Sequence, residues 1–237
     1  MSVNIDEKRA LVIGASGLVG TELLKISLVR HEYSQVIALT RSALPVEHPK
    51  LKVIVCDLND SNAVEDALAD VNATDVFCCL GTTIKRAGSQ EAFRYVDVEL
   101  PLIVARRMKQ RGMEHFLIVT AIGSDPNSRV FYSRMKGIVE QQLRALKIPR
   151  LSIFRPSLLL GNRREFRLAE KLSILITSCF RFAMVGAMKK YKPIHAEQVA
   201  KSMFAIATRA VTEKDSNECS VTVLENRQMF DFIEKLR

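Results

Sequence analysis

The sequence has no tryptophan, few cysteines and no uninterrupted apolar run that is long enough to cross a membrane. Its best candidate for a span, residues 172–180, contains Ser173, Thr177 and Ser178 and is followed by Arg181. A membrane-spanning helix needs roughly 20 consecutive apolar residues. We therefore expect no transmembrane helix.

The five cysteines form neither a disulfide framework nor a metal site. Their number is odd, none belongs to a Cys-x-x-Cys pair, and none lies near a histidine at metal-ligand spacing. His195 and Glu197 are close in sequence, but two such groups without a third partner rarely hold a metal. We expect no metal, and we expect buried free thiols at Cys56, Cys78, Cys79, Cys179 and Cys219.

A secretory signal is also lacking at the N-terminus. Residues 1–8 are polar, and no apolar run leads to a cleavage site with small residues. On this basis we expect a cytoplasmic protein.

The formal net charge of +9 raises the question of a nucleic-acid partner. Lys and Arg are dispersed along the chain, however, and no aromatic residues that could stack on bases are interleaved with them. We therefore expect no nucleic-acid partner. A basic surface still raises the local concentration of an anionic ligand such as a dinucleotide phosphate.

Short apolar runs alternate with amphipathic stretches over the first two thirds of the chain. Alternation of strands and helices predicts an α/β fold with a doubly wound parallel sheet, the Rossmann arrangement. The helix that starts at Gln90 is expected to stop at Gly112, and the next helix to stop before Pro149. The predicted strands are residues 9–14, 35–40, 51–56, 75–80, 115–120 and 151–155, and the predicted helices include 18–29, 90–110 and 130–146.

The length of 237 residues and the apolar content of 48% suit one domain better than two. We predict a single domain over residues 1–237, in which residues 162–237 form a small cap on the substrate side. The alternation loosens in residues 163–188. The cap is then expected to contain a helix at 193–208, a strand at 219–224 and a helix at 228–235.

A glycine-rich segment separates the first predicted strand from the first predicted helix. Its glycines, Gly14, Gly17 and Gly20, follow one another at intervals of three residues. Glycine lets the backbone turn sharply and approach a pyrophosphate, whose charge is met by the N–H groups at the helix N-terminus. Glycines also mark plain strand-to-helix turns, but this position favours a phosphate loop. The predicted cofactor contacts here are Gly14, Ala15, Ser16, Gly17, Leu18 and Val19.

The end of the second strand predicts which dinucleotide is bound. An NAD site usually has an acidic residue there for the ribose hydroxyls, whereas this strand ends in Thr40, Arg41 and Ser42. A guanidinium matches phosphate oxygens, and the two hydroxyls add donors. We predict NADPH or NADP rather than NAD, the alternative being that Arg41 is an ordinary surface arginine.

Two further strand ends are expected to line the cofactor. Asp57 and Leu58 follow the third strand, where the carboxylate could accept a hydrogen bond from the adenine amino group. Residues Leu80, Gly81 and Thr82 follow the fourth strand and are expected beside the adenine ribose and the nicotinamide side.

Tyr132 and Lys136 are four residues apart in a predicted helix, so their side chains share one face. A neighbouring cation lowers the pKa of a phenol, which would let Tyr132 transfer a proton closer to neutral pH. The pattern also occurs by chance on surface helices, but its place after the fifth strand favours catalysis. Thr120 is the predicted active-site hydroxyl and Ser124 the alternative, while Asp97 is a candidate to orient Lys136 through water.

Four segments together resemble the atypical short-chain dehydrogenases, over about residues 9–161. They are residues 14–20, residues 78–83 (Cys-Cys-Leu-Gly-Thr-Thr), residues 132–137 and residues 155–161 (Arg-Pro-Ser-Leu-Leu-Leu-Gly). Within that group the sequence is similar to bacterial relatives of the HIV Tat-interacting protein 2 family, which are NADPH-binding and oxidoreductase-like.

The resemblance implies that Tyr132 and Lys136 take the catalytic positions, and that both also contact the cofactor. It places Pro156, Ser157 and Leu158 beside the nicotinamide carboxamide. The sequence departs from the family at Thr120 and the residue after it, where paired serines are expected.

Taken together, these features predict an NADPH-dependent oxidoreductase that transfers hydride to a small carbonyl substrate, as a monomer or homodimer. The alternative is a regulatory or sensor protein that binds NADPH and a protein partner without turnover. Fold alone identifies neither the substrate nor the direction of the reaction.

Overall fold

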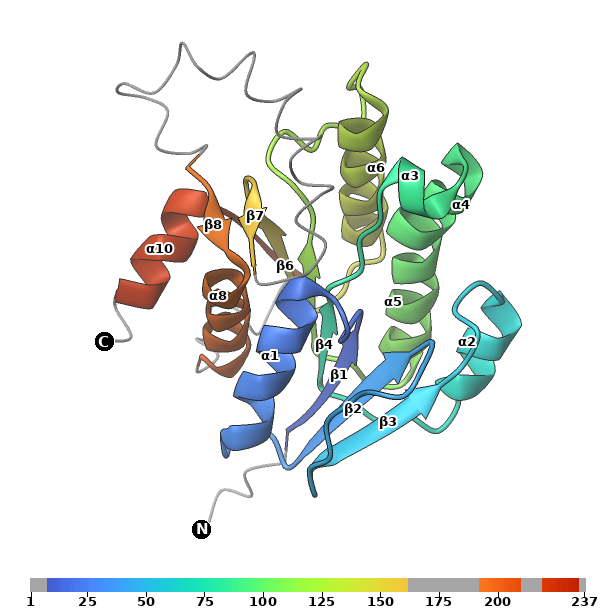
Figure 1. Ribbon diagram of the computed structural model, residues 1–237, viewed down its shortest axis with the longest axis vertical. Helices are drawn as coiled ribbons and strands as arrows, with labels where there is room; N and C mark the ends of the chain where they lie inside the picture. The colour runs from blue at the N-terminus through green and yellow to red at the C-terminus, as the bar shows by residue number, and fades with distance from the viewer. Residues whose placement is uncertain (1–7, 162–191, 210–218, 235–237) are drawn as a thin grey trace.

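The computed structural model describes residues 8–161, 192–209 and 219–234, and these residues form a sheet between two layers of helices (Figure 1). Every neighbouring pair in the sheet is parallel. The strand order is β3-β2-β1-β4-β5-β6-β9, which confirms the predicted doubly wound arrangement. The strands are β1 (Arg9–Ile13), β2 (Gln35–Thr40), β3 (Leu51–Val55), β4 (Asp75–Cys78), β5 (His115–Val119), β6 (Arg150–Arg155) and β9 (Ser220–Glu225).

Alternation along β1 divides the core between the two faces of the sheet. Leu11 and Ile13 pack with the helices on one face, whereas Ala10 and Val12 pack with those on the other. Successive side chains of a strand point to opposite faces, and strands covered on both sides therefore read as continuous apolar runs. The helices are α1 (Leu18–Val29), α8 (Ala196–Thr208) and α10 (Asn226–Glu234) on one side, and α2 (Ser61–Ala67), α5 (Leu100–Gln110) and α6 (Phe131–Ala145) on the other.

The strand order reverses at β1, whose neighbours are β2 on one side and β4 on the other. In open parallel sheets, ligands bind outside the carboxyl ends of the strands at such a reversal. The glycine-rich segment follows β1 directly, and the fold therefore places it at this edge.

The predicted helix 90–110 is present but interrupted. It consists of α4 (Gln90–Arg94), a π-helical turn η1 (Tyr95–Glu99) and then α5. Pro101 has no N–H to donate to the carbonyl four residues earlier, and the N–H of Leu100 bonds the carbonyl of Tyr95, five residues earlier. A π turn inside a helix is frequent at functional sites.

The described parts of residues 162–237 contribute a strand to the sheet and a helix to one of its layers. Strand β9 extends the sheet beside β6, and α8 packs against α1. A separate pair of short strands, β7 (Leu159–Leu160) and β8 (Ile194–His195), joins this region to the end of β6. The short helices α2 and α3 (Ile84–Ala87) and this strand pair were not predicted.

Within the described ranges, no helix is long and apolar enough to cross a membrane. Four of the five cysteines lie in these ranges and are free: Cys56, Cys78, Cys79 and Cys219. The same ranges contain no cluster of three or more His, Cys, Asp or Glu that could hold a metal ion. Cys179 and the segment 163–188 lie outside the described residues.

Candidate functional site

Between β1 and the first turn of α1, the neighbouring backbone leaves no room for a Cβ at two positions, Gly14 and Gly20. Gly14 has a φ of +78°, and a Cβ there would lie 2.7 Å from the carbonyl carbon of Cys79. A Cβ on Gly20 would lie 2.2 Å from the Gly14 carbonyl oxygen. Gly17 precedes α1 and caps it with no side-chain hydrogen bond. The first N–H groups of α1 are thus available to an anion such as a pyrophosphate.

This turn opens on a cavity of about 450 Å³ at the carboxyl ends of β1, β2 and β4. Eleven of the predicted cofactor residues line it: Gly14, Ala15, Ser16, Gly17, Thr40, Arg41, Ser42, Leu58, Leu80, Gly81 and Thr82. The prediction missed Leu39, Asn59, Cys79, Arg86, Ala87, Ala92, Tyr95, Val96 and Leu100, which also line it. Eight predicted cofactor residues lie outside this lining: Leu18, Val19, Asp57, Tyr132, Lys136, Pro156, Ser157 and Leu158.

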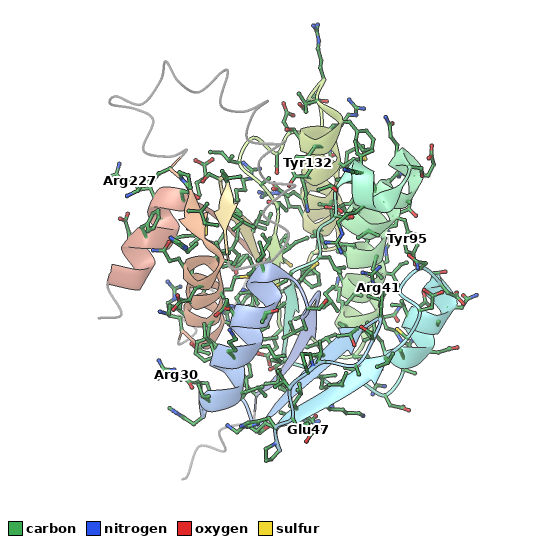
Figure 2. All side chains as sticks on the ribbon, in the orientation of Figure 1. Arg30, Arg41, Glu47, Tyr95, Tyr132 and Arg227 are labelled. Carbon is green, nitrogen blue, oxygen red and sulfur yellow. The ribbon has the colours of Figure 1, made fainter. Side chains whose placement is uncertain are left out.

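Arg41 follows the last residue of β2, is exposed and lines the cavity. Figure 2 labels it near the end of this strand. Arg86, at the end of α3, is a second guanidinium on the same wall. The hydroxyl of Thr40 was predicted to donate to a phosphate, but it donates to the carbonyl of Ser42 at 2.8 Å instead. Thr40 therefore holds the turn that carries Arg41.

Asp57 is held by hydrogen bonds within its own loop. One of its carboxylate oxygens, Oδ1, accepts from the backbone N–H of Asn59 at 2.9 Å and from the Asn59 side chain at 3.0 Å. Leu58 and Asn59 face the cavity instead. The structure does not place Asp57 where an adenine amino group was predicted to meet it.

Tyr95, in the π turn, lines the cavity, and no pattern in the sequence indicated it. Its hydroxyl oxygen is buried and has no hydrogen-bond partner among the described residues. Burial raises the pKa of Tyr95, and the carboxylates of Asp60, Glu99 and Asp57 raise it further.

Tyr132 and Lys136 share one face of α6, as predicted, and a third residue completes the group. The ammonium of Lys136 lies 2.7 Å from Oδ1 of Asp97, and the two side chains are 4% and 0% exposed. Oδ2 of Asp97 accepts from the backbone N–H of Thr82 at 3.0 Å. The link from Asp97 to Lys136 is thus direct, whereas water was predicted between them. Tyr132 is 41% exposed and packs edge-on against Phe93.

The electrostatics of this group differ from the prediction. Desolvation of the phenol raises the pKa of Tyr132; Lys136 acts in the opposite direction, and Asp97 adds to the rise. Burial opposes the charge on Lys136, but Asp97 and Tyr132 outweigh it and hold the Lys136 pKa above its usual value. Because desolvation outweighs the attraction of the ammonium, and Asp97 opposes that attraction, the predicted lowering of the Tyr132 pKa is wrong.

The predicted role of Thr120 is contradicted by its contacts. Thr120 is 4% exposed, and its hydroxyl donates to Oε1 of Glu140 at 2.7 Å. The same Glu140 oxygen accepts from Nε of Arg155 at 3.0 Å. The alternative, Ser124, donates its hydroxyl to the carbonyl of Ala121 at 2.7 Å. Neither proton is available to a substrate carbonyl in this arrangement.

The segment after β6 is fixed by contacts with the C-terminal region. Ser157 donates its N–H to Oδ1 of Asn226 at 2.9 Å and its hydroxyl to the carbonyl of Lys192 at 2.6 Å. These bonds occupy the polar groups of Ser157 that were predicted to meet a carboxamide. The carbonyls of Pro156 and Leu158 accept backbone bonds from Ile122 and Ile194, both at 3.0 Å. The segment therefore has a defined position beside β5 and β8.

A family of proteins described as NAD(P)H-binding matches residues 14–153. Protein FMP52, mitochondrial, from Eremothecium gossypii is 30% identical over 95% of this chain and 97% of that protein. Protein HTATIP2 from Rattus norvegicus is 35% identical over 71% of this chain and 70% of that protein.

Two solved structures have the same fold. One is a short-chain dehydrogenase family protein from Francisella tularensis, with a TM-score of 0.66 and 15% identity, over 94% of this chain and 99% of that one. The other is a short-chain dehydrogenase from Burkholderia cenocepacia in complex with NADP, with a TM-score of 0.65 and 15% identity, over 98% and 93%.

The comparisons overturn the expected cytoplasmic location. The relatives named FMP52, from several yeasts, carry the word mitochondrial in their names. Polar residues at the start of the sequence do not identify a compartment. The cytoplasmic prediction was therefore wrong.

Proposed function

Because this chain belongs to the NAD(P)H-binding family and is an atypical short-chain dehydrogenase, we propose that it is an NADPH-dependent reductase of a carbonyl substrate. The observation that carries the proposal is the group formed by Tyr132, Lys136 and Asp97. Fold and family account for a nucleotide-binding domain, and this group adds a proton donor with a neighbouring cation. The substrate is a small carbonyl compound that reaches the exposed phenol of Tyr132.

The residues that line the cavity fit a dinucleotide. The glycine turn leaves room where a Cβ on Gly14 would collide, and the residues that precede α1, Gly14 to Gly17, line the cavity. Arg41 and Arg86 supply two guanidinium groups on its wall, and a planar guanidinium pairs well with a phosphate. These arginines favour NADPH over NADH, since only NADPH carries a 2′-phosphate.

Tyr132 acts as the general acid in the proposed reaction. The bound dinucleotide supplies the hydride. The hydroxyl of Tyr132 donates a hydrogen bond to the carbonyl oxygen and gives up its proton as negative charge develops there. With its pKa raised, Tyr132 stays protonated at neutral pH, which is the form that reduction needs. The ammonium of Lys136 then stabilises the phenolate that is left, and Asp97 keeps Lys136 charged and in place.

A second candidate is a sensor that binds NADPH and a protein partner without turnover. One observation favours it: the hydroxyl of Thr120 is bonded to Glu140 and is not offered to a substrate. Without the Thr120 hydroxyl, a reductase keeps the acid Tyr132 and the cation Lys136 but loses one hydrogen bond to the developing oxyanion. The reductase hypothesis therefore allows slow turnover, whereas the sensor hypothesis predicts none.

The test is NADPH oxidation against a panel of aldehydes and ketones, with wild type and Tyr132→Phe. We expect wild type to oxidise NADPH with a substrate from the panel. In Tyr132→Phe the rate should fall by roughly 100-fold or more, which is the usual contribution of general acid catalysis, while NADPH affinity should be similar in both proteins. Tyr33→Phe is the matched control, because it removes a buried phenol hydroxyl that donates to Asp75 at the other end of the sheet. Equal rates in wild type and Tyr132→Phe would refute the assignment of the acid.

A further inference from the structure

The lining of the cavity includes apolar side chains that suit a flat ring. Leu39 and Leu58 form part of its wall, and Val96 and Leu100 come from the π turn and the start of α5. Apolar walls with a few polar groups at the edge are typical of small-molecule sites. The polar group at this edge is the hydroxyl of Tyr95, which Figure 2 places on the same side of the molecule as Arg41.

The Tyr95 hydroxyl is a buried polar atom whose partner is missing from the described residues. Leaving such a group unpaired costs about 1–3 kcal/mol, and native proteins therefore rarely do so without a reason. A ligand that fills the cavity and bonds this oxygen removes the cost.

The charges around this hydroxyl decide what kind of ligand atom it can meet. Asp57, Asp60 and Glu99 all act on Tyr95 with negative charge. None of these carboxylates lines the cavity, and negative charge favours the hydroxyl orientation whose hydrogen points towards it, so we infer that an oxygen lone pair is left for the cavity. A ring edge that carries an N–H donor is attracted to this corner, whereas a ring edge that carries a carbonyl oxygen is repelled.

We propose that Tyr95 recognises the 6-amino group of the adenine ring and thereby selects an adenine dinucleotide over a 6-oxopurine one. The proposal rests on the proposed cofactor and names the residue that reads its base. Asp57 was predicted for this role from its place after β3, but one of its oxygens is engaged by Asn59 and the residue does not line the cavity. Tyr95 reaches the same corner from the π turn.

The experiment is titration calorimetry with NADPH and with its hypoxanthine analogue, in which a 6-oxo group replaces the 6-amino group. One net hydrogen bond contributes about 1 kcal/mol, which is roughly a fivefold change in Kd. We expect wild type to bind NADPH about fivefold more tightly than the analogue. In Tyr95→Phe, NADPH affinity falls by about the same factor and the preference for NADPH disappears.

Tyr33→Phe serves as the control, since it lacks a phenol hydroxyl remote from the cavity, and it should keep the wild-type preference. Equal affinity of wild type for the two dinucleotides overturns the proposal while leaving the cofactor assignment intact. The same holds if Tyr95→Phe keeps the full preference. Binding of neither dinucleotide by wild type refutes the proposed function itself.

Discussion

The ammonium of Lys136 and the carboxylate of Asp97 form an ion pair of 2.7 Å that is almost wholly buried. The pair joins helix α6 to the π turn η1, and Thr82 extends it to the end of β4 through its backbone N–H. It therefore connects the proposed proton donor to the cavity wall. Desolvation of the phenol, with Asp97 opposing the effect of the ammonium, explains why the pKa of Tyr132 is not lowered by the lysine beside it.

Replacing Asp97 by Asn tests how much this ion pair contributes to the stability of the fold. The change leaves a buried cation without its counter-charge, and we expect the free energy of unfolding to fall by about 3 kcal/mol in urea denaturation. Glu197→Gln is the control, because it breaks an exposed pair with Lys201 and should cost less than about 1 kcal/mol. A cost for Asp97→Asn no larger than that of the control would contradict the account.

The pH dependence of the same difference follows from the sign of the Lys136 shift. Its folded pKa lies above the unfolded value, so its contribution to stability is complete below about pH 10 and is lost as the pH rises through the folded value. From about pH 6 to pH 9 the contribution of Lys136 to the stability of wild type should thus stay constant. In Asp97→Asn, burial lowers the Lys136 pKa without the opposing carboxylate, so the cost of the substitution should shrink as the pH rises through that lower value. A cost that does not shrink before the stability of wild type itself falls would contradict the account.

The raised pKa of Tyr132 predicts the pH profile of reduction. A phenol that titrates above its ordinary value of about 10 remains an acid throughout the physiological range. The rate of carbonyl reduction should therefore be flat from about pH 6 to pH 9 and fall only at higher pH. A decline between about pH 6 and pH 8 would instead place the phenol pKa near neutrality, as the sequence alone suggested.

Thr120→Val tests whether the hydroxyl serves the fold or the substrate. The variant leaves Glu140 with the Arg155 bonds and removes one buried hydrogen bond, which should cost about 1–2 kcal/mol of stability. We expect the reduction rate to change by less than about threefold, well below the effect of Tyr132→Phe. A loss of rate as large as that of Tyr132→Phe would show that the Thr120 hydroxyl acts in catalysis.

Gly14→Ala tests the close approach of the phosphate turn to Cys79. Its Cβ would overlap the Cys79 backbone, and its positive φ adds strain, so stability should fall by more than about 2 kcal/mol. Gly81→Ala is the control for stability, because a Cβ there meets nothing within 4 Å. Equal stability of the two variants would mean that the turn can relax.

The sequence predicted the sheet well because its signals are local. Each strand from β1 to β6 is a short apolar run, and its bounds agree with the prediction to within two residues. The glycine spacing and the pair Tyr132 and Lys136 are local for the same reason, since a turn and one helical face fix them. Arg41 was found because it ends a strand.

What the sequence could not supply depends on how elements pack against each other. Tyr95 owes its position to a π turn that was not predicted, and the same turn brings Asp97, a candidate from the sequence, into direct contact with Lys136. Thr120 was assigned by its place after β5, but its partner Glu140 lies twenty residues away on α6. Strand β9 adds to the sheet from the far end of the chain, which no local pattern reveals.

The measurement that tests the central claim most directly is titration calorimetry of wild type and Arg41→Ala with NADPH and NADH. We expect wild type to bind NADPH more tightly than NADH, and Arg41→Ala to weaken NADPH binding by about 10- to 100-fold, since a charge-assisted hydrogen bond contributes roughly 1.5–3 kcal/mol. NADH affinity should be nearly the same in both proteins. Binding of neither dinucleotide, or a preference for NADH that Arg41→Ala leaves unchanged, would contradict the account.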